Sequence, residues 1–446
     1  MEGIKIDIPN YAKYIIDKLN ENGFEAYLVG GCVRDSIIGK KPNDWDITTS
    51  ALPKDVKKIF RKTIDTGIKH GTVTVLYNKI PIEVTTYRID GEYEDNRRPK
   101  TVEFTNNLIL DLKRRDFTIN AMAYNHKIGL VDVFNGAQDI KKGIIRCVGN
   151  PLERFNEDAL RMLRAIRFSA QLGYEIDSGT RDAIIRSSKL IENVSMERIQ
   201  VEINKTLLSD NPSHFLELYN CKLMQYIVPE FMPCIGCAQN HPYHSYEVHE
   251  HILRSVKVIK SNKALRWTML LHDIGKPQVK TTDKDGIDHF YGHEAISAKM
   301  AEKILKRLKF DNNTINKVVK LIKYHDIRLE VDYKIIRRAI NKIGKELFTD
   351  FLLVQRADVM AQNPDKLEKR LRILEDVNKV YEEITRLDQC VSIKDLEING
   401  KDLIDNGVKE GKQIGVLLSK LLEIVIDDPS KNDKNILLNI VKDIIK

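Results

Sequence analysis

The sequence lacks the features that mark secreted, disulfide-bonded or membrane-spanning proteins. Six cysteines in 446 residues are too few for a disulfide framework. No apolar run approaches the roughly 18 residues that a membrane-spanning helix needs. Residues 1–7 have neither the basic flank nor the apolar core of a signal peptide. We therefore expect a cytoplasmic protein without a membrane-bound part.

Low-complexity segments and fixed-period repeats are also missing. Hydrophobic residues make up 42% of the chain, which excludes disorder as the dominant state. At roughly 150 residues per domain, the length suggests about three domains. Lys and Arg number 72 against 64 Asp and Glu, a mild surplus that permits a polyanionic partner without requiring one.

What the sequence does contain is an uneven distribution of strand and helix signals. The first part mixes both, and a hairpin is predicted around Asn78-Lys79. Beyond Asn150-Pro151 strand signals nearly vanish, and apolar residues recur at helical spacing in residues 160–172, 199–208, 248–259, 295–308 and 367–384. We expect an α+β head followed by all-helical parts, with the divisions at residues 1–149, 150–240, 241–365 and 366–446.

A glycine turn in the head points to phosphate binding. Leu28-Val-Gly-Gly-Cys-Val-Arg-Asp35 places Gly30 and Gly31 directly after a predicted strand. A tight turn there lets backbone N–H groups approach phosphate oxygens, and Arg34 adds a charged fork for the same purpose. Taken alone, the two glycines are also compatible with a purely structural turn.

A carboxylate pair follows in Asn43-Asp-Trp-Asp-Ile-Thr-Thr49. Residues two apart on a strand point to the same face, so Asp44 and Asp46 would project together. Their repulsion favours a bound cation, and Mg²⁺ fits best because it prefers oxygen ligands and substrate phosphates. Glu83 is a candidate third carboxylate for in-line attack of a hydroxyl on an α-phosphate. The alternative for each acid is an ordinary solvated position.

Together with three later segments, these motifs resemble the class II tRNA nucleotidyltransferases, the family of CCA-adding enzymes and bacterial poly(A) polymerases. Asp111-Leu-Lys-Arg-Arg-Asp-Phe-Thr-Ile-Asn-Ala-Met-Ala123 resembles the family motif after the flexible loop. Arg154-Phe-Asn-Glu-Asp-Ala-Leu-Arg-Met-Leu-Arg164 resembles the nucleobase-reading helix. Ser195-Met-Glu-Arg-Ile199 resembles the helix start that braces this reader. The five motifs stand in family order.

The resemblance implies a polymerase-β-like head that adds CMP and AMP, from CTP and ATP, to the 3′ end of tRNA. It makes Asp44, Asp46 and Glu83 the catalytic residues, with Mg²⁺ held by Asp44 and Asp46. It assigns nucleotide binding to Gly30, Gly31, Arg34, Arg115, Asp116, Asn120, Asp158, Arg161 and Arg164. Asp158 and Arg161 would read the base, since Asp accepts from an amine and Arg donates to ring acceptors. From spacing alone, the two would form a salt bridge on one helix.

A polar segment at residues 87–99, with Gly91 and Pro99, is typical of a mobile loop. In the resembled family, a loop at this place is needed to switch from adding C to adding A, and relatives that add only CC tend to have it shortened. The segment looks complete here. It therefore favours CCA addition or A addition over CC addition.

A second constellation lies in the helical body. His272 and Asp273 end an apolar helical run, where buried polar neighbours need a metal or a hydrogen-bond network. With His251 upstream and Asp358 downstream, the order resembles the HD phosphohydrolase superfamily. His293 and His325 match the extra histidines of its two-metal members. The resemblance implies an HD domain that binds a divalent cation of unspecified identity, with a phosphatase or cyclic phosphodiesterase activity as an open question.

Two other features carry weaker signals. Cys234 and Cys237 form a single C-x-x-C with His241 and His244 nearby, so a zinc site is conceivable but packing is the simpler interpretation. The last part, residues 366–446, resembles the C-terminal module of the same fused proteins. Glycines near helix starts, with Lys401 and Lys412, could contact an RNA backbone; helix caps are the alternative.

Several functions remain open on this sequence. Within the same class, the chain could be an A-adding enzyme with a separate CC-adding partner, or a poly(A) polymerase. From another class, it could act mainly as an HD phosphohydrolase or phosphodiesterase, or as an RNA-binding scaffold. The sequence does not determine the oligomeric state.

Overall fold

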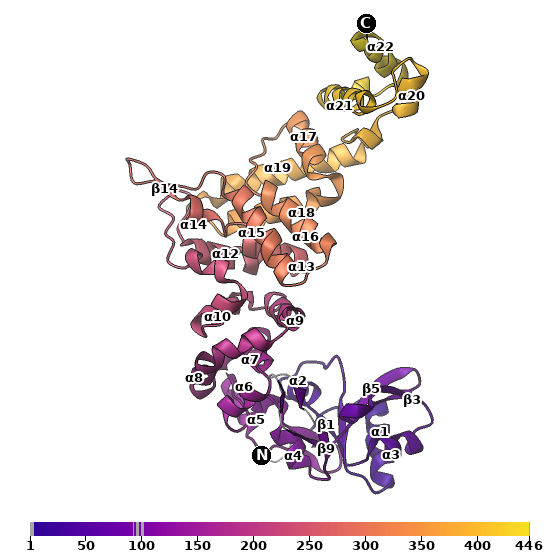
Figure 1. The fold of residues 1–446 in the computed structure, drawn as a ribbon, viewed down its shortest axis with the longest axis vertical. Helices are drawn as coiled ribbons and strands as arrows, with labels where there is room; N and C mark the ends of the chain where they lie inside the picture. Colours follow the sequence, from indigo (N-terminus) through magenta and orange to yellow (C-terminus); the bar gives the residue numbers. More distant parts are fainter. Residues whose placement is uncertain (1–3, 92, 95–97, 100–101, 446) are drawn as a thin grey trace. The chain divides into compact units, whose positions relative to one another are not determined.

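The structure is a computed structural model that describes residues 4–91, 93–94, 98–99 and 102–445. The chain forms two compact units, Met1–Met232 and Pro233–Lys446 (Figure 1). The N-terminal unit combines a sheet with helices, whereas the C-terminal unit is helical apart from one short β-ribbon. The expected α+β head and helical body are therefore confirmed, and the finer four-part division stays a prediction.

The strands of the N-terminal unit are short. They are β1 (Ala26–Val29), β2 (Ile47–Thr49), β3 (Thr63–Gly67), β4 (Thr72–Tyr77), β5 (Ile80–Thr86), β6 (Arg88–Asp90), β7 (Tyr93–Glu94), β8 (Arg98–Pro99), β9 (Val102–Phe104), β10 (Ala123–Asn125), β11 (Gly129–Val131), β12 (Ile144–Ile145) and β13 (Glu175–Ile176). The main sheet has the order β11-β10-β1-β2-β5-β4-β3. Its pairs are antiparallel except β2 with β5, so the sheet is mixed.

The helices of this unit are α1 (Asn10–Glu21), α2 (Gly31–Ile37), α3 (Pro53–Ile59), α4 (Leu108–Lys113), α5 (Gly136–Lys142), α6 (Pro151–Glu157), α7 (Leu160–Leu172), α8 (Ser178–Ser187), α9 (Met196–Leu207), α10 (Glu217–Asn220) and α11 (Met224–Ile227). The short 3₁₀-helix η2 (Thr118–Asn120) follows α4. The predicted helix over 160–172 coincides with α7, and the one over 199–208 corresponds to α9.

Strand β1 is an interior strand of the main sheet, and all four of its residues are buried. Successive side chains of a strand point to opposite faces. Tyr27 and Val29 pack with Leu108 and Leu112 of α4 in one apolar cluster. Helix α1 packs on β1 through an apolar stripe that includes Ile15, Ile16 and Leu19. A central strand covered on both faces leaves its C-terminal end, at Gly30, as the place where the chain can meet a ligand.

The predicted hairpin is confirmed. Strands β4 and β5 are antiparallel and pair Tyr77 with Ile80. Asn78 and Lys79 between them have φ of 49° and 68°, the left-handed pair that a two-residue hairpin loop requires. Pro81 causes no conflict, because β2 pairs with β5 only from Val84 onward.

The C-terminal unit is built from helices α12 (Val248–Val258), α13 (Lys263–Leu271), α14 (Lys276–Val279), α15 (His293–Arg307), α16 (Asn312–Tyr324), α17 (Tyr333–Ile343), α18 (Lys345–Met360), α19 (Leu367–Arg386), α20 (Gly400–Asp405), α21 (Lys412–Asp427) and α22 (Lys434–Ile445), with the ribbon β14 (Thr281–Thr282) and β15 (Asp288–His289). Helices α12, α13, α15 and α19 correspond to predicted helices. Among the described residues, no helix is long and apolar enough to cross a membrane. All six cysteines are free, as expected.

A buried ion pair joins α7 to α9 in the N-terminal unit. Arg167 Nη1 lies 3.0 Å from Glu202 Oε2, and the two residues are only 5% and 4% exposed. Removing one partner of a buried pair leaves an uncompensated charge.

We therefore expect Glu202→Gln to lower the unfolding free energy of the N-terminal unit by about 3 kcal/mol. Glu197→Gln is the matched control, because it makes the same change at an exposed position of α9 and should stay within about 0.5 kcal/mol. Urea denaturation, with hydrogen exchange at the amides of α7 and α9, measures both. Equal stability of the two variants would contradict this role of the pair.

Candidate active site and metal centre

The glycine turn starts beside the acidic segment of the head. Val29, the last residue of β1, donates its N–H to the carbonyl of Asp46 at 3.1 Å. Gly30 has a φ of 79°, a left-handed conformation that favours glycine. A Cβ at Gly30 would lie 3.3 Å from Nη1 of Arg115. The turn thus keeps room for close approach between its backbone and this guanidinium.

Asp44 and Asp46 precede β2 rather than lying on it, which corrects the expectation of a strand over this segment. The strand is short because its neighbour β1 ends at the glycine turn and leaves Asp44 without a pairing partner. Strands β2 and β5 pair Ile47 with Val84 in parallel. Asp46 and Glu83 each stand one residue earlier, so they are neighbours in the register.

The electrostatics at Asp46 favour a cation. Burial away from water is the main cause that raises the pKa of Asp46, to about 6, and the nearby carboxylate of Glu83 is the second. Asp44 also contributes in the same direction. In the described part of the chain, these three carboxylates do not form a group whose oxygens all lie within 4.8 Å of one another. Metal binding at this place stays a prediction.

A continuous polar network links α2, η2 and α7. Arg34 Nη1 donates to Asn120 Oδ1 at 2.7 Å, and Asn120 Nδ2 donates to Asp116 Oδ1 at 3.2 Å. The other oxygen of Asp116 accepts from Arg164 Nε at 2.7 Å. Burial disfavours the charge on Asp116, but Arg164 and Asn120 outweigh it and lower its pKa to about 2. Two of the expected triphosphate-binding cations, Arg34 and Arg164, are thus held by one buried carboxylate and its amide neighbour.

Arg115 is held by an acid that the sequence analysis did not assign. Its Nη2 lies 3.3 Å from Oδ2 of Asp111, which is fully buried. Asp111 also accepts from Arg114 Nε at 2.9 Å and from the hydroxyl of Thr48 at 3.2 Å. Burial opposes its charge, but Arg115 and Arg114 lower its pKa below the usual value. The sequence feature that could have identified Asp111 is its position as the first residue of the motif 111–123.

Asp158 and Arg161 do not share a helix, which corrects the helical placement of this pair. Helix α6 ends at Glu157, and Asp158 has extended backbone with φ −139° and ψ 103°. Its Oδ1 accepts the N–H of Leu160 at 3.1 Å, and such a local side-chain bond competes with continued helix. In place of the salt bridge that spacing allowed, Asp158 pairs with Arg198 and Arg161 pairs with Glu157.

Asp158 and Arg161, the expected base readers, have different protein partners. Asp158 Oδ2 accepts from Arg198 Nη2 at 2.8 Å, and Arg161 Nη1 donates to Glu157 Oε2 at 2.6 Å. Arg161 also donates to the carbonyl of Arg114 at 3.0 Å. The sequence analysis did not assign Glu157 or Arg198. Their signals were the four-residue spacing of Glu157 and Arg161 and the motif 195–199.

The described residues of the expected loop at 87–99 include short β-strands. Arg88–Asp90 pairs with Val102–Phe104, and Tyr93–Glu94 pairs with Arg98–Pro99. Residues 92, 95–97 and 100–101 lie outside the described residues. The role of this segment in switching nucleotides stays a prediction.

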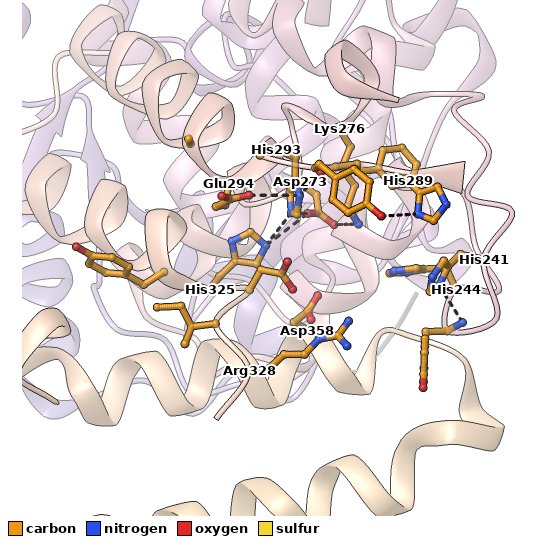
Figure 2. A pocket seen from close by; sticks show the side chains of 18 of the residues that line it. His241, His244, Asp273, Lys276, His289, His293, Glu294, His325, Arg328 and Asp358 are labelled. Carbon is orange, nitrogen blue, oxygen red and sulfur yellow. Dashed lines mark hydrogen bonds and ion pairs between the residues drawn. The ribbon is translucent and has the colours of Figure 1, made fainter. Parts of the chain in front are cut away.

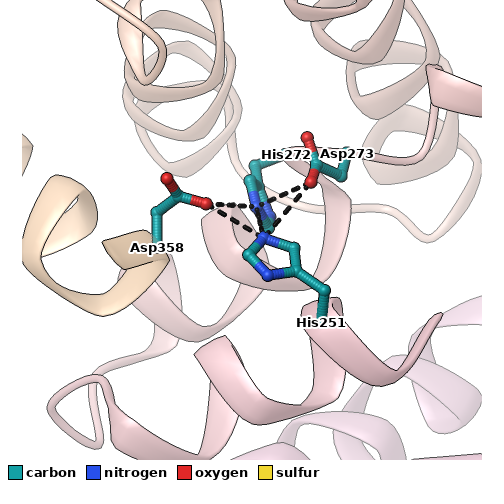
Figure 3. Close-up of side chains that lie close together, drawn as sticks. All are labelled: His251, His272, Asp273 and Asp358. Carbon is teal, nitrogen blue, oxygen red and sulfur yellow. Dashed lines mark hydrogen bonds and ion pairs between the residues drawn. The ribbon is translucent and has the colours of Figure 1, made fainter. Parts of the chain in front are cut away.

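Four residues of the body converge at one point (Figure 3). His251 lies on α12, His272 and Asp273 directly follow α13, and Asp358 lies on α18. Nε2 of His251 is 2.9 Å from Asp358 Oδ1 and 3.3 Å from Asp273 Oδ2. It is 3.2 Å from Nε2 of His272. These residues form a group that could hold a metal ion.

A second group shares Asp273. His293, the first residue of α15, has its Nε2 3.1 Å from Asp273 Oδ1. His325, at the end of α16, has its Nε2 3.6 Å from the same oxygen and 3.3 Å from Nε2 of His293. Figure 2 shows Asp273, His293 and His325 together at the wall of a cavity. Asp273 thus presents one carboxylate oxygen to each group.

Backbone carbonyls orient all four imidazoles. The Nδ1 atoms of His272, His293 and His325 lie 2.7, 2.8 and 2.7 Å from the carbonyls of the residues three positions earlier. Nδ1 of His251 lies 3.2 Å from the carbonyl of Ala361. Each Nδ1–H donates to its carbonyl, so a neutral ring presents the lone pair of Nε2 to the cluster.

The electrostatics of the cluster favour positive charge. Burial opposes a proton on His272, but Asp273 and Asp358 outweigh burial and raise its pKa to about 10. His251 and His272 hold the pKa of Asp358 well below its usual value, although burial acts in the opposite direction. Lys276 adds a buried ammonium 2.7 Å from Asp273 Oδ2.

The cysteine pair is not part of either group. Cys234 is buried with its Sγ 3.9 Å from the carbonyl of Ile274. Burial raises the pKa of its thiol, which disfavours the thiolate that zinc would need. Among the described residues, neither Cys234 nor Cys237 belongs to a cluster with metal-ligand spacing. Packing therefore accounts for Cys234.

Three segments of the chain match described protein domains. Residues 26–146 match the poly(A) polymerase head domain, and residues 173–235 match the RNA- and SrmB-binding site of polymerase A. Residues 282–441 match tRNA nucleotidyltransferase domain 2. The order agrees with the motifs that the sequence analysis identified.

Solved structures resemble the whole chain. The crystal structure of the Bacillus stearothermophilus CCA-adding enzyme in complex with CTP has a TM-score of 0.73 and 28% sequence identity, and the match covers 97% of this chain and 96% of that chain. The Thermotoga maritima CCA-adding enzyme complexed with tRNA has a TM-score of 0.57 and 20% identity over 100% of this chain and 97% of that chain, which supports the fold alone.

Curated relatives share the full length. The CCA-adding enzyme of Ligilactobacillus salivarius is 36% identical over 438 residues, covering 97% of this chain and 96% of its own. The CCA-adding enzyme of Bacillus velezensis is 34% identical, with 94% of both chains covered. With this identity over nearly the whole length and a polymerase-β-like head, the chain belongs to the CCA-adding enzyme family of tRNA nucleotidyltransferases.

Proposed function

We propose that this chain adds the 3′-terminal CCA to tRNA from CTP and ATP without a nucleic-acid template. The observation that carries the proposal is the position of Asp46, which neighbours Glu83 in the sheet and is hydrogen-bonded through its carbonyl to Val29 at the glycine turn. Carboxylates and a phosphate-binding turn thereby lie at one edge of the head. Full-length relatives named CCA-adding enzymes support the tRNA substrate.

The reaction is an attack of the terminal ribose hydroxyl on the α-phosphate, with pyrophosphate as the leaving group. Asp44 and Asp46, assisted by Glu83, would hold Mg²⁺, and the raised pKa of Asp46 fits a position that favours a cation. When bound, the ion supplies electrostatic stabilisation of the phosphate and lowers the pKa of the hydroxyl. Arg34 and Arg115 stand beside the turn and bind the triphosphate.

Base selection rests on one acceptor and one donor. Cytosine and adenine each offer an amine next to a ring acceptor, whereas uracil and guanine invert that pattern. Asp158 would accept from the amine and Arg161 would donate to the ring. Arg198 and Glu157 hold these two side chains, so the reading pattern is fixed by the protein. Addition of A alone, or poly(A) synthesis, is the alternative within this class.

The helical segments outside the head are assigned from the family resemblance. We propose that residues 150–240 read the nucleobase and contact RNA, and that residues 366–446 bind tRNA. Lys401 and Lys412 are exposed near the starts of α20 and α21, where helix N-termini attract phosphate. A cytoplasmic location follows from a tRNA substrate.

A second activity is favoured by the histidine–aspartate groups of the body. We propose that residues 241–365 form an HD-type domain that binds divalent cations through His251, His272, Asp273, His293, His325 and Asp358. Ligand atoms about 2.1 Å from an ion lie about 3.0 Å apart in an octahedron and about 3.4 Å apart in a tetrahedron. In the first group, the distances of His251 Nε2 and His272 Nε2 from each other and from the carboxylate oxygens of Asp273 and Asp358 are 2.9–3.4 Å. These distances fall in the range expected for ligands of one ion.

Bound cations would supply a nucleophilic hydroxide and neutralise phosphate charge. Asp273 would contribute to both groups, because its two oxygens face different histidines. The four imidazoles, each oriented by a backbone carbonyl, would complete the ligand sets. This arrangement supports hydrolysis of a phosphate ester in the body, independent of the head.

The first experiment tests CCA addition with three tRNA substrates, ending at the discriminator base, at C and at CC. The intact chain with Mg²⁺, CTP and ATP should extend all three to CCA. Asp44→Asn and Asp46→Asn should each lower incorporation by at least 1,000-fold, because they remove charge from the proposed Mg²⁺ ligands. Products are resolved at single-nucleotide length.

Asp65→Asn is the matched control for these variants, because it removes an exposed carboxylate of β3. Growth of the CC-ended substrate alone, with ATP alone, would identify an A-adding enzyme instead. Incorporation that survives both Asp44→Asn and Asp46→Asn would contradict the assigned catalytic residues.

Base reading is tested by Asp158→Ala. Loss of one acceptor should cost about 1–3 kcal/mol of discrimination between CTP and UTP, or roughly 5- to 150-fold. The readout is the ratio of kcat/KM for the two nucleotides. Asp182→Ala, at an exposed position of α8, should leave the ratio unchanged. An unaltered ratio in Asp158→Ala would remove this residue from the reader.

The body site is tested by Asp273→Ala. Because Asp273 contributes to both groups, the variant should lose nearly all tightly bound divalent metal, measured by mass spectrometry of the purified full chain. Hydrolysis of p-nitrophenyl phosphate should fall at least 100-fold, with CCA addition changed less than about twofold. Asp285→Ala, at a nearby exposed position, serves as the control. Unchanged metal content in Asp273→Ala would refute the proposed ligand set.

A further inference from the structure

The histidine–aspartate groups of the body lie where two cavities meet. One cavity has a volume of about 730 Å³ (Figure 2), and the other has a volume of about 630 Å³. Each is within the range of a cavity that holds a small molecule. Two ligand-sized spaces therefore adjoin one set of candidate metal ligands.

The two cavities share a wall that contains ligands from both groups. His325 of one group and Asp358 of the other line each cavity, and so do Tyr243, Arg328 and Arg370. Figure 2 places Arg328 beside Asp358. A phosphate held at this wall would have cationic side chains next to it and open space on two sides.

The first cavity presents flat aromatic faces. The rings of His289 and Tyr291 are stacked at 5.3 Å with an angle of 7°, and those of His241 and Tyr243 are stacked at 5.6 Å with an angle of 30°. Tyr291 is 78% exposed, so its outer face is open to a ligand. Aromatic faces of this kind stack on nucleobases with little sequence preference.

The second cavity combines charged and apolar side chains at the start of α19. Lys366 and Lys369 are exposed and line this cavity but not the first, as do the carboxylates Asp365 and Glu368 and the apolar Ile373 and Leu374. An apolar surface with charged side chains of both signs beside it offers packing and hydrogen bonds to a second nucleoside. A monoester at the shared wall would occupy one cavity and leave the other without a function.

We propose that the body site hydrolyses a linear phosphodiester that carries a nucleoside on each side, as in a dinucleotide or a short single-stranded oligonucleotide. This inference rests on the proposed phosphohydrolase function of the same site. Water adds to phosphorus as the new P–O bond forms, the P–O bond to one nucleoside breaks, and the departing oxygen takes the proton. One nucleoside lies in each cavity, with the phosphate at the wall between them.

The test compares four esters with the full-length chain and Mn²⁺: the dinucleotide ApA, 2′,3′-cyclic AMP, 3′-AMP and p-nitrophenyl phosphate. We expect kcat/KM for ApA to exceed that for each other ester at least tenfold. Asp273→Ala should abolish this turnover, which excludes a contaminating nuclease, whereas Asp65→Asn, at an exposed position of the head, should leave it unchanged.

Two variants probe the second cavity. Leu374→Trp fills it, and the double change Lys366→Glu with Lys369→Glu replaces two exposed lysines of its lining by acids. Each should lower kcat/KM for ApA at least tenfold and change kcat/KM for p-nitrophenyl phosphate by less than twofold. Lys379→Glu, an exposed position on the same helix outside the cavity, is the control.

Binding gives a readout that needs no turnover. Fluorescein-labelled ApA is titrated into the Asp273→Ala chain with saturating CTP and ATP at the head, and its anisotropy is followed. Adding Lys366→Glu and Lys369→Glu should weaken binding at least tenfold.

The outcomes separate the two proposals. If the chain hydrolyses the monoesters or cyclic AMP but does not hydrolyse ApA, this inference is overturned and the phosphohydrolase function is retained. Absence of turnover of all four esters would overturn both. Equal loss of ApA and p-nitrophenyl phosphate turnover in the second-cavity variants would also overturn the assignment of one nucleoside to each cavity.

Discussion

The ion pair of Asp116 with Arg164 joins the parts of the head that must act together. This buried carboxylate lies between Arg164 on α7 and Asn120, which in turn holds Arg34 beside the glycine turn. Because an uncompensated charge at such a position is costly, the cations on its two sides are fixed relative to each other. The glycine turn and the helix that carries Arg161 are thereby joined by one hydrogen-bonded network.

The same constraint governs the body, where a buried carboxylate again lies among positively charged groups. Asp273 is buried and faces ring nitrogens of both histidine groups, and its pKa is held well below the usual value by His272 and Lys276 against burial. In the head, Asp46 and Glu83 are neighbours in the register of β2 and β5. In the body, imidazoles oriented by backbone carbonyls surround a shared carboxylate. Each arrangement suits phosphate chemistry, and each draws its ligands from separate elements.

Much of the fold could be predicted from periodicity. The helix at 160–172 and the hairpin at Asn78-Lys79 were predicted correctly because their signals are local: an apolar stripe in one, and two left-handed residues in the other. The strand placement of Asp44 failed because pairing depends on where β1 ends. The helix through Asp158 failed because its side chain bonds the N–H of Leu160, a contact that competes with helical hydrogen bonds.

The sequence by itself determined which residue types are present in which order, and hence the family resemblance, the carboxylates of the head and the histidines of the body. Only the tertiary structure decided which of them meet. Residues 107 positions apart, His251 and Asp358, come within 2.9 Å because α12 packs against α18. The partners Arg198 of Asp158 and Asp111 of Arg115, and the two cavities at the body cluster, likewise depend on packing between elements, which no local pattern of residues encodes.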